Sequence, residues 1–211
     1  MASKRGPYAR TQQRREDIAR AVLEIVEETG HDAVTIAQIS ERSDTSEATI
    51  LYHFPSRDHL LVAALELSDR LSEEQSRPSD PDAAFSLDDF RASIEAGSHD
   101  GNLVRLLLVL RGQSATPEHP AVAYFAERNA RQLSIFTELI ASRQRAGLAL
   151  AGLEPRVLAL QLVGLWDGLT NLWITGQDFE IADVVIDAYR RLAGENVIAA
   201  RTLVNSTDFG L

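Results

Sequence analysis

The sequence predicts an all-α protein of about nine helices, with a three-helix N-terminal domain followed by a larger helical domain. Apolar residues recur every three or four positions along most of the chain, which is the spacing of one helix face. Glycine and proline fall between these stretches, where helices begin and end. No stretch alternates polar and apolar residues over the length of a strand, so we expect no β-sheet.

Composition limits the classes of protein to which the chain can belong. Of its 211 residues, 45% are hydrophobic and 25% are charged, which is typical of a globular protein. The absence of cysteine excludes disulfides and cysteine-based zinc sites. The first twenty residues lack the apolar segment of a secretory signal, and polar residues interrupt each apolar run before it reaches membrane-spanning length. We therefore expect a cytoplasmic protein without membrane contact.

The net charge of −10 and the isoelectric point near 5.0 argue at first against a nucleic-acid partner. The distribution of charge weakens this argument, because basic residues are concentrated near the N-terminus. Residues 1–10 contain a Gly-Pro pair, have no periodicity and read as a flexible basic arm. Such an arm either follows DNA phosphates or a minor groove, or only solubilises the chain. A first helix is expected from residue 11 to residue 29, and Gly30 ends it.

Residues 35–57 predict two short helices joined by a tight turn. Thr35 caps the first helix, and Gln38 completes a Thr-x-x-Gln capping box. Residues 43–46 are short polar residues that favour a turn, and Ser46 is a natural cap for the second helix. Pro55 forces the preceding residue out of helical geometry and so ends that helix.

The second of these helices has two distinct faces at 100° per residue. On one side we expect the apolar residues Ile50, Leu51 and Phe54. On the other we expect an exposed face made by Ala48, Thr49, Tyr52 and His53. Two helices joined by a short turn form a helix-turn-helix, whose second helix enters the DNA major groove. The alternative is an ordinary corner between two helices with a solvated face.

The segment from residue 14 to residue 61 resembles the DNA-binding domain of the TetR family of bacterial transcriptional regulators. The residues that match the family pattern are Thr35, Ile36, Ile39, Ser46, Thr49, Ile50, His53, Phe54, Ser56 and Arg57. The resemblance implies that residues 1–57 form a DNA-binding domain that recognises a double-stranded operator. The residues expected to form the DNA-binding surface are Thr35, Ser46, Glu47, Ala48, Thr49, Tyr52, His53 and Arg57. Glu47 either accepts a hydrogen bond from a cytosine or only caps the helix, and we favour the cap.

The chain departs from the family pattern at four positions. Asp44 replaces the turn glycine, Thr45 the valine after it, and Ala48 a second glycine. Aspartate tolerates the left-handed conformation better than most residues, so we expect the turn to be kept. Leu51 stands where the family has a tyrosine, and Tyr52 is our candidate to replace that tyrosine at a DNA phosphate.

Residues 58–211 predict a helical domain for ligand binding and dimerisation. We expect its first helix to follow a cap at Ser56 and to end before a loop at Arg77, and further helices at residues 86–96, 103–110, 120–145, 155–175 and 179–192, followed by a weakly patterned tail. The helix at 155–175 is apolar on nearly every side and must be buried on two sides. Gly164 and Gly168 in it would let another backbone approach closely. The resemblance implies a homodimer made through the last two long helices.

The density of apolar residues after Asn102 predicts a pocket for a small hydrophobic effector. The residues expected to line this pocket are Leu106, Leu110, Tyr124, Phe125, Arg128, Phe136, Trp166 and Trp173. Arg128 would pair with a carboxylate on the effector, or alternatively would form a surface salt bridge. For the two tryptophans, plain core packing is the alternative.

No pattern in the sequence indicates an enzyme, a metal site or a cofactor. The five histidines include no pair at i, i+4, and there is no phosphate-binding glycine loop or nucleophile motif. We therefore predict a homodimeric transcriptional regulator, most simply a repressor released from a palindromic operator by its effector. The alternatives are a DNA-binding regulator without an effector, a helical protein-interaction module and, third, an enzyme.

Overall fold

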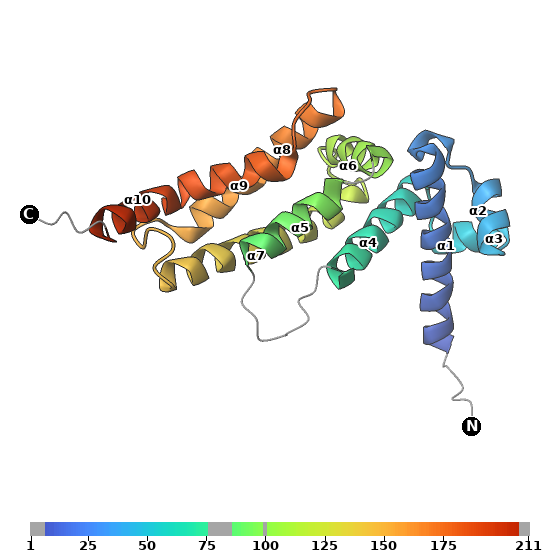
Figure 1. Ribbon diagram of the computed structural model, residues 1–211. Coiled ribbons are helices and arrows are strands. Elements are labelled where there is room, and N and C mark those ends of the chain that lie inside the picture. Colours follow the sequence, from blue (N-terminus) through green and yellow to red (C-terminus); the bar gives the residue numbers. More distant parts are fainter. Residues whose placement is uncertain (1–6, 76–85, 99–100, 207–211) are drawn as a thin grey trace, which may run out of the picture. The chain divides into compact units, whose positions relative to one another are not determined.

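A computed structural model of the chain describes residues 7–75, 86–98 and 101–206, and every regular element in these ranges is helical (Figure 1). This confirms the all-α prediction, with ten α-helices and one short 3-10 helix where about nine helices were expected. The elements are α1 Pro7–Thr29, η1 His31–Ala33, α2 Ile36–Ser43, α3 Glu47–His53, α4 Arg57–Gln75, α5 Leu87–Ser98, α6 Gly101–Gln113, α7 Ala121–Arg145, α8 Pro155–Ile174, α9 Ile181–Leu192 and α10 Glu195–Ser206.

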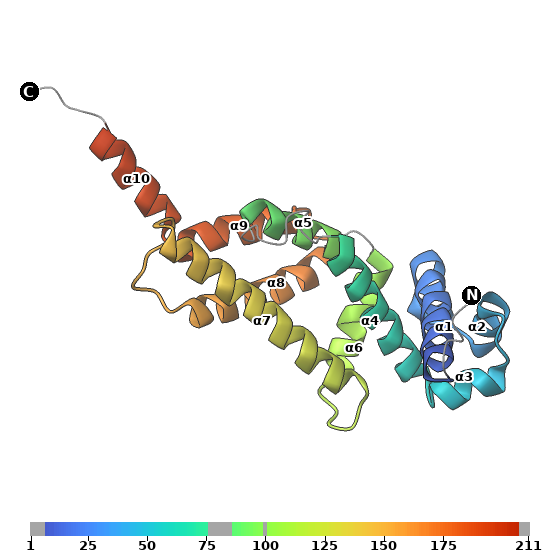
Figure 2. The same ribbon diagram turned by 90° about the horizontal axis from the view of Figure 1, so that it is seen from below.

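The chain forms two compact units, the first made of residues 1–75 and 99–126 and the second of residues 76–98 and 127–211. In the first unit α1 is the central helix: α2 and α3 pack on one side of it, and α4 and α6 on another (Figure 2). Leu60 and Leu67 of α4 and Leu106 of α6 share one buried cluster with α1. The boundary after residue 57 between a DNA-binding and a ligand-binding domain stays a prediction. In its packing, α4 belongs with the helices before it.

The first helix begins earlier than the sequence predicted. Residues 7–10, which we expected in a flexible arm, form the first turn of α1, while residues 1–6 lie outside the described residues. Proline is tolerated at a first helical position because its missing N–H would have no partner there. The expected stripe is confirmed further along, since Ile18, Val22 and Ile25 are all buried.

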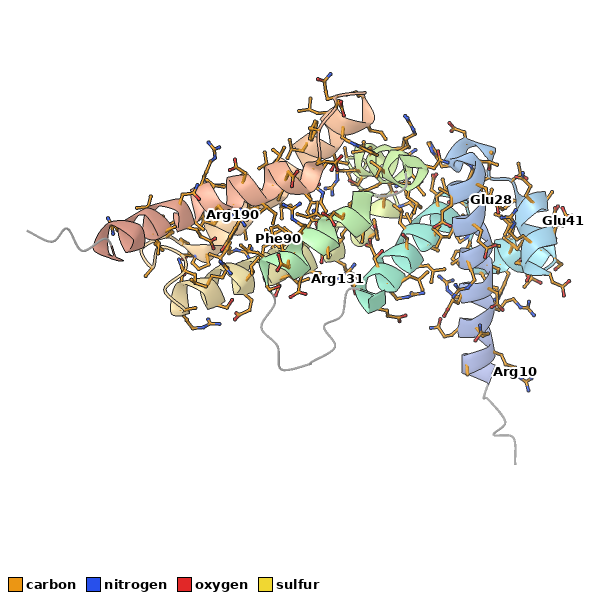
Figure 3. All side chains as sticks on the ribbon, in the orientation of Figure 1. Arg10, Glu28, Glu41, Phe90, Arg131 and Arg190 are labelled. Carbon is orange, nitrogen blue, oxygen red and sulfur yellow. The ribbon has the colours of Figure 1, made fainter. Side chains whose placement is uncertain are left out.

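The second unit has its own apolar core, contributed by α5 and by α7 to α9. Its largest fully buried side chains include Tyr189 of α9 and Phe90 of α5. Figure 3 labels Phe90 among the packed helices. Phe90 lies edge-on to Phe136, with the ring centroids 4.8 Å apart. Ser86 caps α5, because its Oγ accepts from the N–H of Asp89 at 3.1 Å and the Asp89 carboxylate accepts from the N–H of Ser86. The Ser86 hydroxyl, which donates to the same carboxylate at 2.7 Å, and then the Ser86 N–H lower the pKa of Asp89.

A tenth helix, α10, replaces the weakly patterned tail expected after Gly194. Its first residue, Glu195, accepts a hydrogen bond from Nε of Arg143 at 2.5 Å and another from the Tyr189 hydroxyl at 3.0 Å. Burial, with the nearby Glu195 carboxylate, raises the pKa of Tyr189. Gly194 has φ +71°, and a Cβ on it would lie 2.3 Å from Cδ1 of Leu150. These contacts come from earlier parts of the chain, so the sequence pattern of the tail could not show them.

Helix α8 is more apolar than we expected from the sequence. Alone among the described helices, it is long and apolar enough to span a bilayer, although we had expected polar residues to interrupt every such run. Only 22% of its apolar segment is buried within the chain. Core helices and interface helices satisfy the same criteria, so length and composition leave open what covers the exposed part of α8.

Candidate functional site

The first helix of the predicted motif is capped as expected. The Thr35 side chain accepts from the N–H of Gln38, and the Gln38 side chain accepts from the N–H of Thr35 at 3.1 Å. Such a reciprocal box satisfies two backbone donors that the first helical turn leaves unpaired. Thr35 is exposed at the start of α2, so the structure places it at the surface and gives its hydroxyl a structural role.

The turn between α2 and α3 depends on two of the substitutions in the family pattern. Asp44 adopts the left-handed conformation, with φ 46° and ψ 46°, and ends α2. This confirms that aspartate can take the place of the turn glycine. Thr45 is buried, but its hydroxyl has two partners: it accepts from Nη1 of Arg14 at 3.0 Å and donates to the carbonyl of Ser43 at 3.0 Å. A threonine is therefore accommodated where the family has a valine.

Helix α3 begins and ends where the sequence predicts. Ser46 caps it by accepting from the N–H of Thr49, and its hydroxyl lies 2.8 Å from that of Thr49. Glu47 is exposed in the first turn, where a negative charge is favourable. Phe54 takes an extended conformation, with φ −136°, immediately before Pro55.

The two faces of α3 agree with the prediction except at Leu51 and, in part, at Thr49 and His53, whose side chains are half-buried and not exposed. Ile50 and Phe54 are buried, while Ala48 and Tyr52 are exposed, Tyr52 at 83%. Leu51, which we expected on the buried side, is 49% exposed. That expectation was wrong because Leu51 lies 100° around the helix from Ile50, at the edge of the buried face.

Two arginines of α1 hold the second half of the motif, and the sequence analysis did not single them out as site residues. Arg15 donates to the carbonyl of His53 at 2.7 Å and lies over the ring of Phe54, with its guanidinium carbon 4.4 Å from the centroid. Arg14 reaches the turn through Thr45. Both arginines thus lie beside α3 and bring positive charge to it. Consecutive arginines on a helix expected to cross the motif were the available signal.

His53 is half-buried at the end of α3, with its ring edge-on to that of Tyr52 at a centroid separation of 5.2 Å. Burial, together with the charges of Arg15 and Arg14, lowers the pKa of His53 below its ordinary value of 6.5. At neutral pH the imidazole is therefore uncharged. His53 can offer a hydrogen bond at this surface, but not a second cation beside the arginines.

Arg57 is exposed at the first position of α4, and its guanidinium donates to the carbonyl of His31. Its place on the DNA-binding surface stays a prediction, and this bond fixes the direction of the side chain. Near the C-terminal end of α2, Arg42 makes two hydrogen bonds of 2.7 Å to the carboxylate of Glu28 on α1. Arg10 extends the basic side of α1 at its exposed N-terminal end (Figure 3).

The residues predicted to line an effector pocket are divided between the two cores. Leu106, Leu110, Tyr124 and Phe125 are buried in the first. Phe136 is buried in the second core, and Trp166 and Trp173 pack against that core. Tyr124 and Phe125 already have internal partners, since the Tyr124 hydroxyl donates to Asp69 and Arg111 lies over the Phe125 ring. Arg128 is half-buried on α7.

Helix α7 also carries two polar groups that the sequence analysis missed. The side-chain oxygens of Asn129 and Gln132 are buried, and neither has a hydrogen-bond partner among the described residues. An unpaired buried acceptor costs about 1–3 kcal/mol, so such groups call for a ligand, a water or an ion. They lie on the same side of α7 as Phe136, because positions 129, 132 and 136 fall within one helix face. Among the described residues, no group of three metal-binding side chains occurs.

Comparisons with known proteins identify the motif. A family model described as bacterial regulatory proteins, tetR family, matches residues 18–64. The HTH-type transcriptional repressor KstR of Mycolicibacterium smegmatis is 42% identical over 53 residues, which are 25% of this chain and 26% of that protein. The match thus spans about a quarter of the length of this curated relative. The family-model match falls on the segment that carries the capped helices and the turn.

Solved structures extend the similarity to the whole fold. A TetR transcription regulator from Haloarcula marismortui is 20% identical, with a TM-score of 0.69 over 87% of this chain and 97% of that one. AibR, solved in complex with isovaleryl coenzyme A and operator DNA, is 16% identical, with a TM-score of 0.52 over 85% of this chain and 98% of that one. At these identities the similarity establishes the fold.

Proposed function

We propose, from the premise that this chain belongs to the TetR family of bacterial regulatory proteins, that it is a homodimeric repressor of transcription. It binds a palindromic operator in double-stranded DNA and is released by a small hydrophobic effector. The observation that carries the proposal is the exposed face of α3 between two arginines of α1. A short helix capped at its start and flanked by cations suits the major groove between two phosphate backbones.

A second copy of the chain is the proposed cover for α8. Val157, Leu160 and Leu172 are each about half exposed, and a Cβ on Gly164 or Gly168 would meet nothing within 4 Å. Isologous dimers bury one such surface against its own copy, and small residues permit close approach of two helices. Dimerisation through α8 and α9 would also place two recognition helices on two half-sites, which one seven-residue helix needs for specificity.

The proposed effector site lies in the second unit, where aromatic side chains and unpaired polar groups occur together. Phe136 and Trp166 are stacked with their centroids 6.1 Å apart, and Trp173 packs against the same core. Asn129 and Gln132, with Arg128 beside them, would anchor the polar end of an otherwise apolar molecule. AibR binds isovaleryl coenzyme A, which combines a short acyl chain with a polar carrier. We propose an effector of this amphipathic kind.

Helix α7 offers a route by which an effector would act on DNA binding. It runs from the second unit into the first, where His119, just before it, has Nε2 3.2 Å from the Asp58 carboxylate of α4. Asp58 is two residues beyond Ser56, which caps α4 directly after the recognition helix. An effector that prefers one position of α7 would therefore bias the position of α3, and a tenfold preference corresponds to about 1.4 kcal/mol.

The experiment is a DNA retardation assay with the duplex upstream of the gene, run at several salt concentrations. A protein that contacts six or more phosphates loses about 1,000-fold in affinity between about 50 and 200 mM salt. Tyr52→Ala should weaken binding without loss of stability, and Val109→Ala on α6, also exposed, is the matched control. Binding that is insensitive to salt, or to Tyr52→Ala, would instead favour a protein-interaction module.

The effector is tested by titrating tryptophan fluorescence with acyl-coenzyme A thioesters and free fatty acids of several lengths. A ligand that changes the emission of Trp166 and Trp173 should also release the DNA at the same concentration. If Gln132→Leu abolishes the response while the DNA affinity is unchanged, the polar groups of α7 belong to the site. Fluorescence and retardation that stay unchanged across the panel would leave the regulator without an effector of this class.

A further inference from the structure

Helix α3 exposes apolar surface where a soluble domain has little reason to do so. Between residues 9 and 74, whose side chains the structure describes, the large hydrophobic side chains that lie exposed are Leu51 and Tyr52, both on α3. Ala48, one turn before them, is also exposed. Residues three and four positions apart are neighbours on a helix, so these three side chains form one continuous apolar patch.

The polar groups of α3 are largely committed to the helix itself. The hydroxyls of Ser46 and Thr49 bond each other, and Ser46 caps the helix. The ring of His53 is turned edge-on to Tyr52 and carries no charge at neutral pH. Direct hydrogen-bond readout of bases therefore has few donors on this helix. Van der Waals contact has more surface available, and Leu51 is the largest purely aliphatic part of it.

The apolar feature of the major groove is the C5 methyl group of thymine, which distinguishes thymine from cytosine. We propose that Leu51, with Ala48 beside it, packs against a thymine methyl in each operator half-site and so specifies a T·A pair there. The inference rests on the proposed function, because it assumes that α3 enters the major groove. The charges of Arg14 and Arg15 on either side favour duplex DNA over a protein as the occupant of this patch.

The expected effect follows from the burial of one methyl group, which changes an affinity by about fourfold. Two symmetric half-sites should together give about fifteenfold. The tyrosine that the family carries at position 51 would present a hydroxyl instead, so this preference would belong to this chain and not to the family pattern.

The test replaces thymine by deoxyuridine, which removes the methyl group and leaves base pairing unchanged. An operator is first selected from random duplexes, and each symmetric thymine pair is then replaced in turn. We expect one pair at which the replacement weakens binding of the wild-type protein about fifteenfold. Leu51→Ala should bind the thymine and deoxyuridine operators equally. Val109→Ala should keep the full discrimination, because Val109 is exposed on α6.

Each outcome decides the proposal separately from DNA binding itself. Specific, salt-sensitive binding in which every deoxyuridine pair costs Leu51→Ala as much as wild type would overturn the role of Leu51 and leave the proposed function intact. Absence of salt-sensitive binding to any selected duplex would remove both. Circular dichroism and thermal unfolding of Leu51→Ala establish that the variant is folded. Because half of the side chain is exposed, we expect its stability to fall by no more than that of Val109→Ala.

Discussion

Two exposed apolar surfaces of this protein differ in what surrounds them. The α3 surface consists of Ala48, Leu51 and Tyr52, and the α8 surface of Val157, Leu160, Gly164, Gly168 and Leu172. Arginines flank the first, and its helix has seven residues. The second runs along a helix of 20 residues that includes two charged side chains, Arg156 and Asp167.

The difference teaches that exposed apolar area alone does not indicate the partner. A short apolar patch between cations suits the groove of a polyanion, where phosphate contacts supply affinity and methyl contacts supply selectivity. A long apolar face with glycines suits another helix, because burial of apolar area then provides the main driving force. The supports differ as well, since both helices contribute to an apolar core but α3, with the turn before it, is also held by polar contacts to Arg14 and Arg15 of α1.

The largest effect is expected from a charge on the α8 surface. Leu160→Glu should raise the dimer dissociation constant at least about 100-fold, because each dimer would bury two unpaired carboxylates. Analytical ultracentrifugation measures this, with Val109→Glu on α6 as the matched control. A dimer that is unaffected by Leu160→Glu but lost in Val109→Glu would reverse the assignment of surfaces.

The next largest effect concerns the polar support of α3. Arg15→Ala removes the bond to the His53 carbonyl and the contact with Phe54, so DNA affinity should fall about tenfold, or about 1.4 kcal/mol. Arg20→Ala is the control, because Arg20 pairs with exposed Glu16 on its own helix and its loss should change DNA affinity little. Equal losses in the two variants would mean that charge, and not position, is what matters.

A smaller effect, on the free energy of unfolding, is expected when the helix caps near the two surfaces are removed. Thr35→Ala removes the capping box of α2 and should lower the free energy of unfolding by about 1 kcal/mol, while Thr35→Ser should keep most of it. Glu154→Ala removes the corresponding cap of α8, where the side chain accepts from the N–H of Arg156 at 3.1 Å. Chemical denaturation compares the two. We expect the smaller loss at Glu154, because α8 is held by its core.

The smallest effect is a dependence on pH that should be confined to the α3 region. Because burial, Arg15 and Arg14 lower the pKa of His53, the unfolded chain binds more protons than the folded chain as pH falls below about 6.5. The free energy of unfolding should therefore decrease as pH falls below about 6.5 and recover as pH rises again. His53→Gln should flatten this dependence in urea unfolding, while self-association through α8 should stay the same. A steeper pH dependence of the unfolding free energy in His53→Gln would contradict its origin in the His53 imidazole.

The sequence by itself determined the features that depend on contacts within about four residues along the chain. The capping box at Thr35, the left-handed Asp44, the cap at Ser46 and the end of α3 before Pro55 were all predicted, and the structure shows each of them. Their partners are sequence neighbours, so residue type and spacing suffice. The resemblance to the family rests on the same local pattern, and the comparisons match it at residues 18–64.

Only the tertiary structure decided which faces are covered and which distant groups meet. Arg14 reaches Thr45 across 31 positions and Arg15 reaches His53 across 38, and Leu51, at the edge of the buried face, is left exposed. Helix α10 depends in the same way on Arg143, which lies 52 positions before Glu195. A helical period tells which residues share a face, but the width of that face is set by the neighbouring helix, and no local pattern contains it.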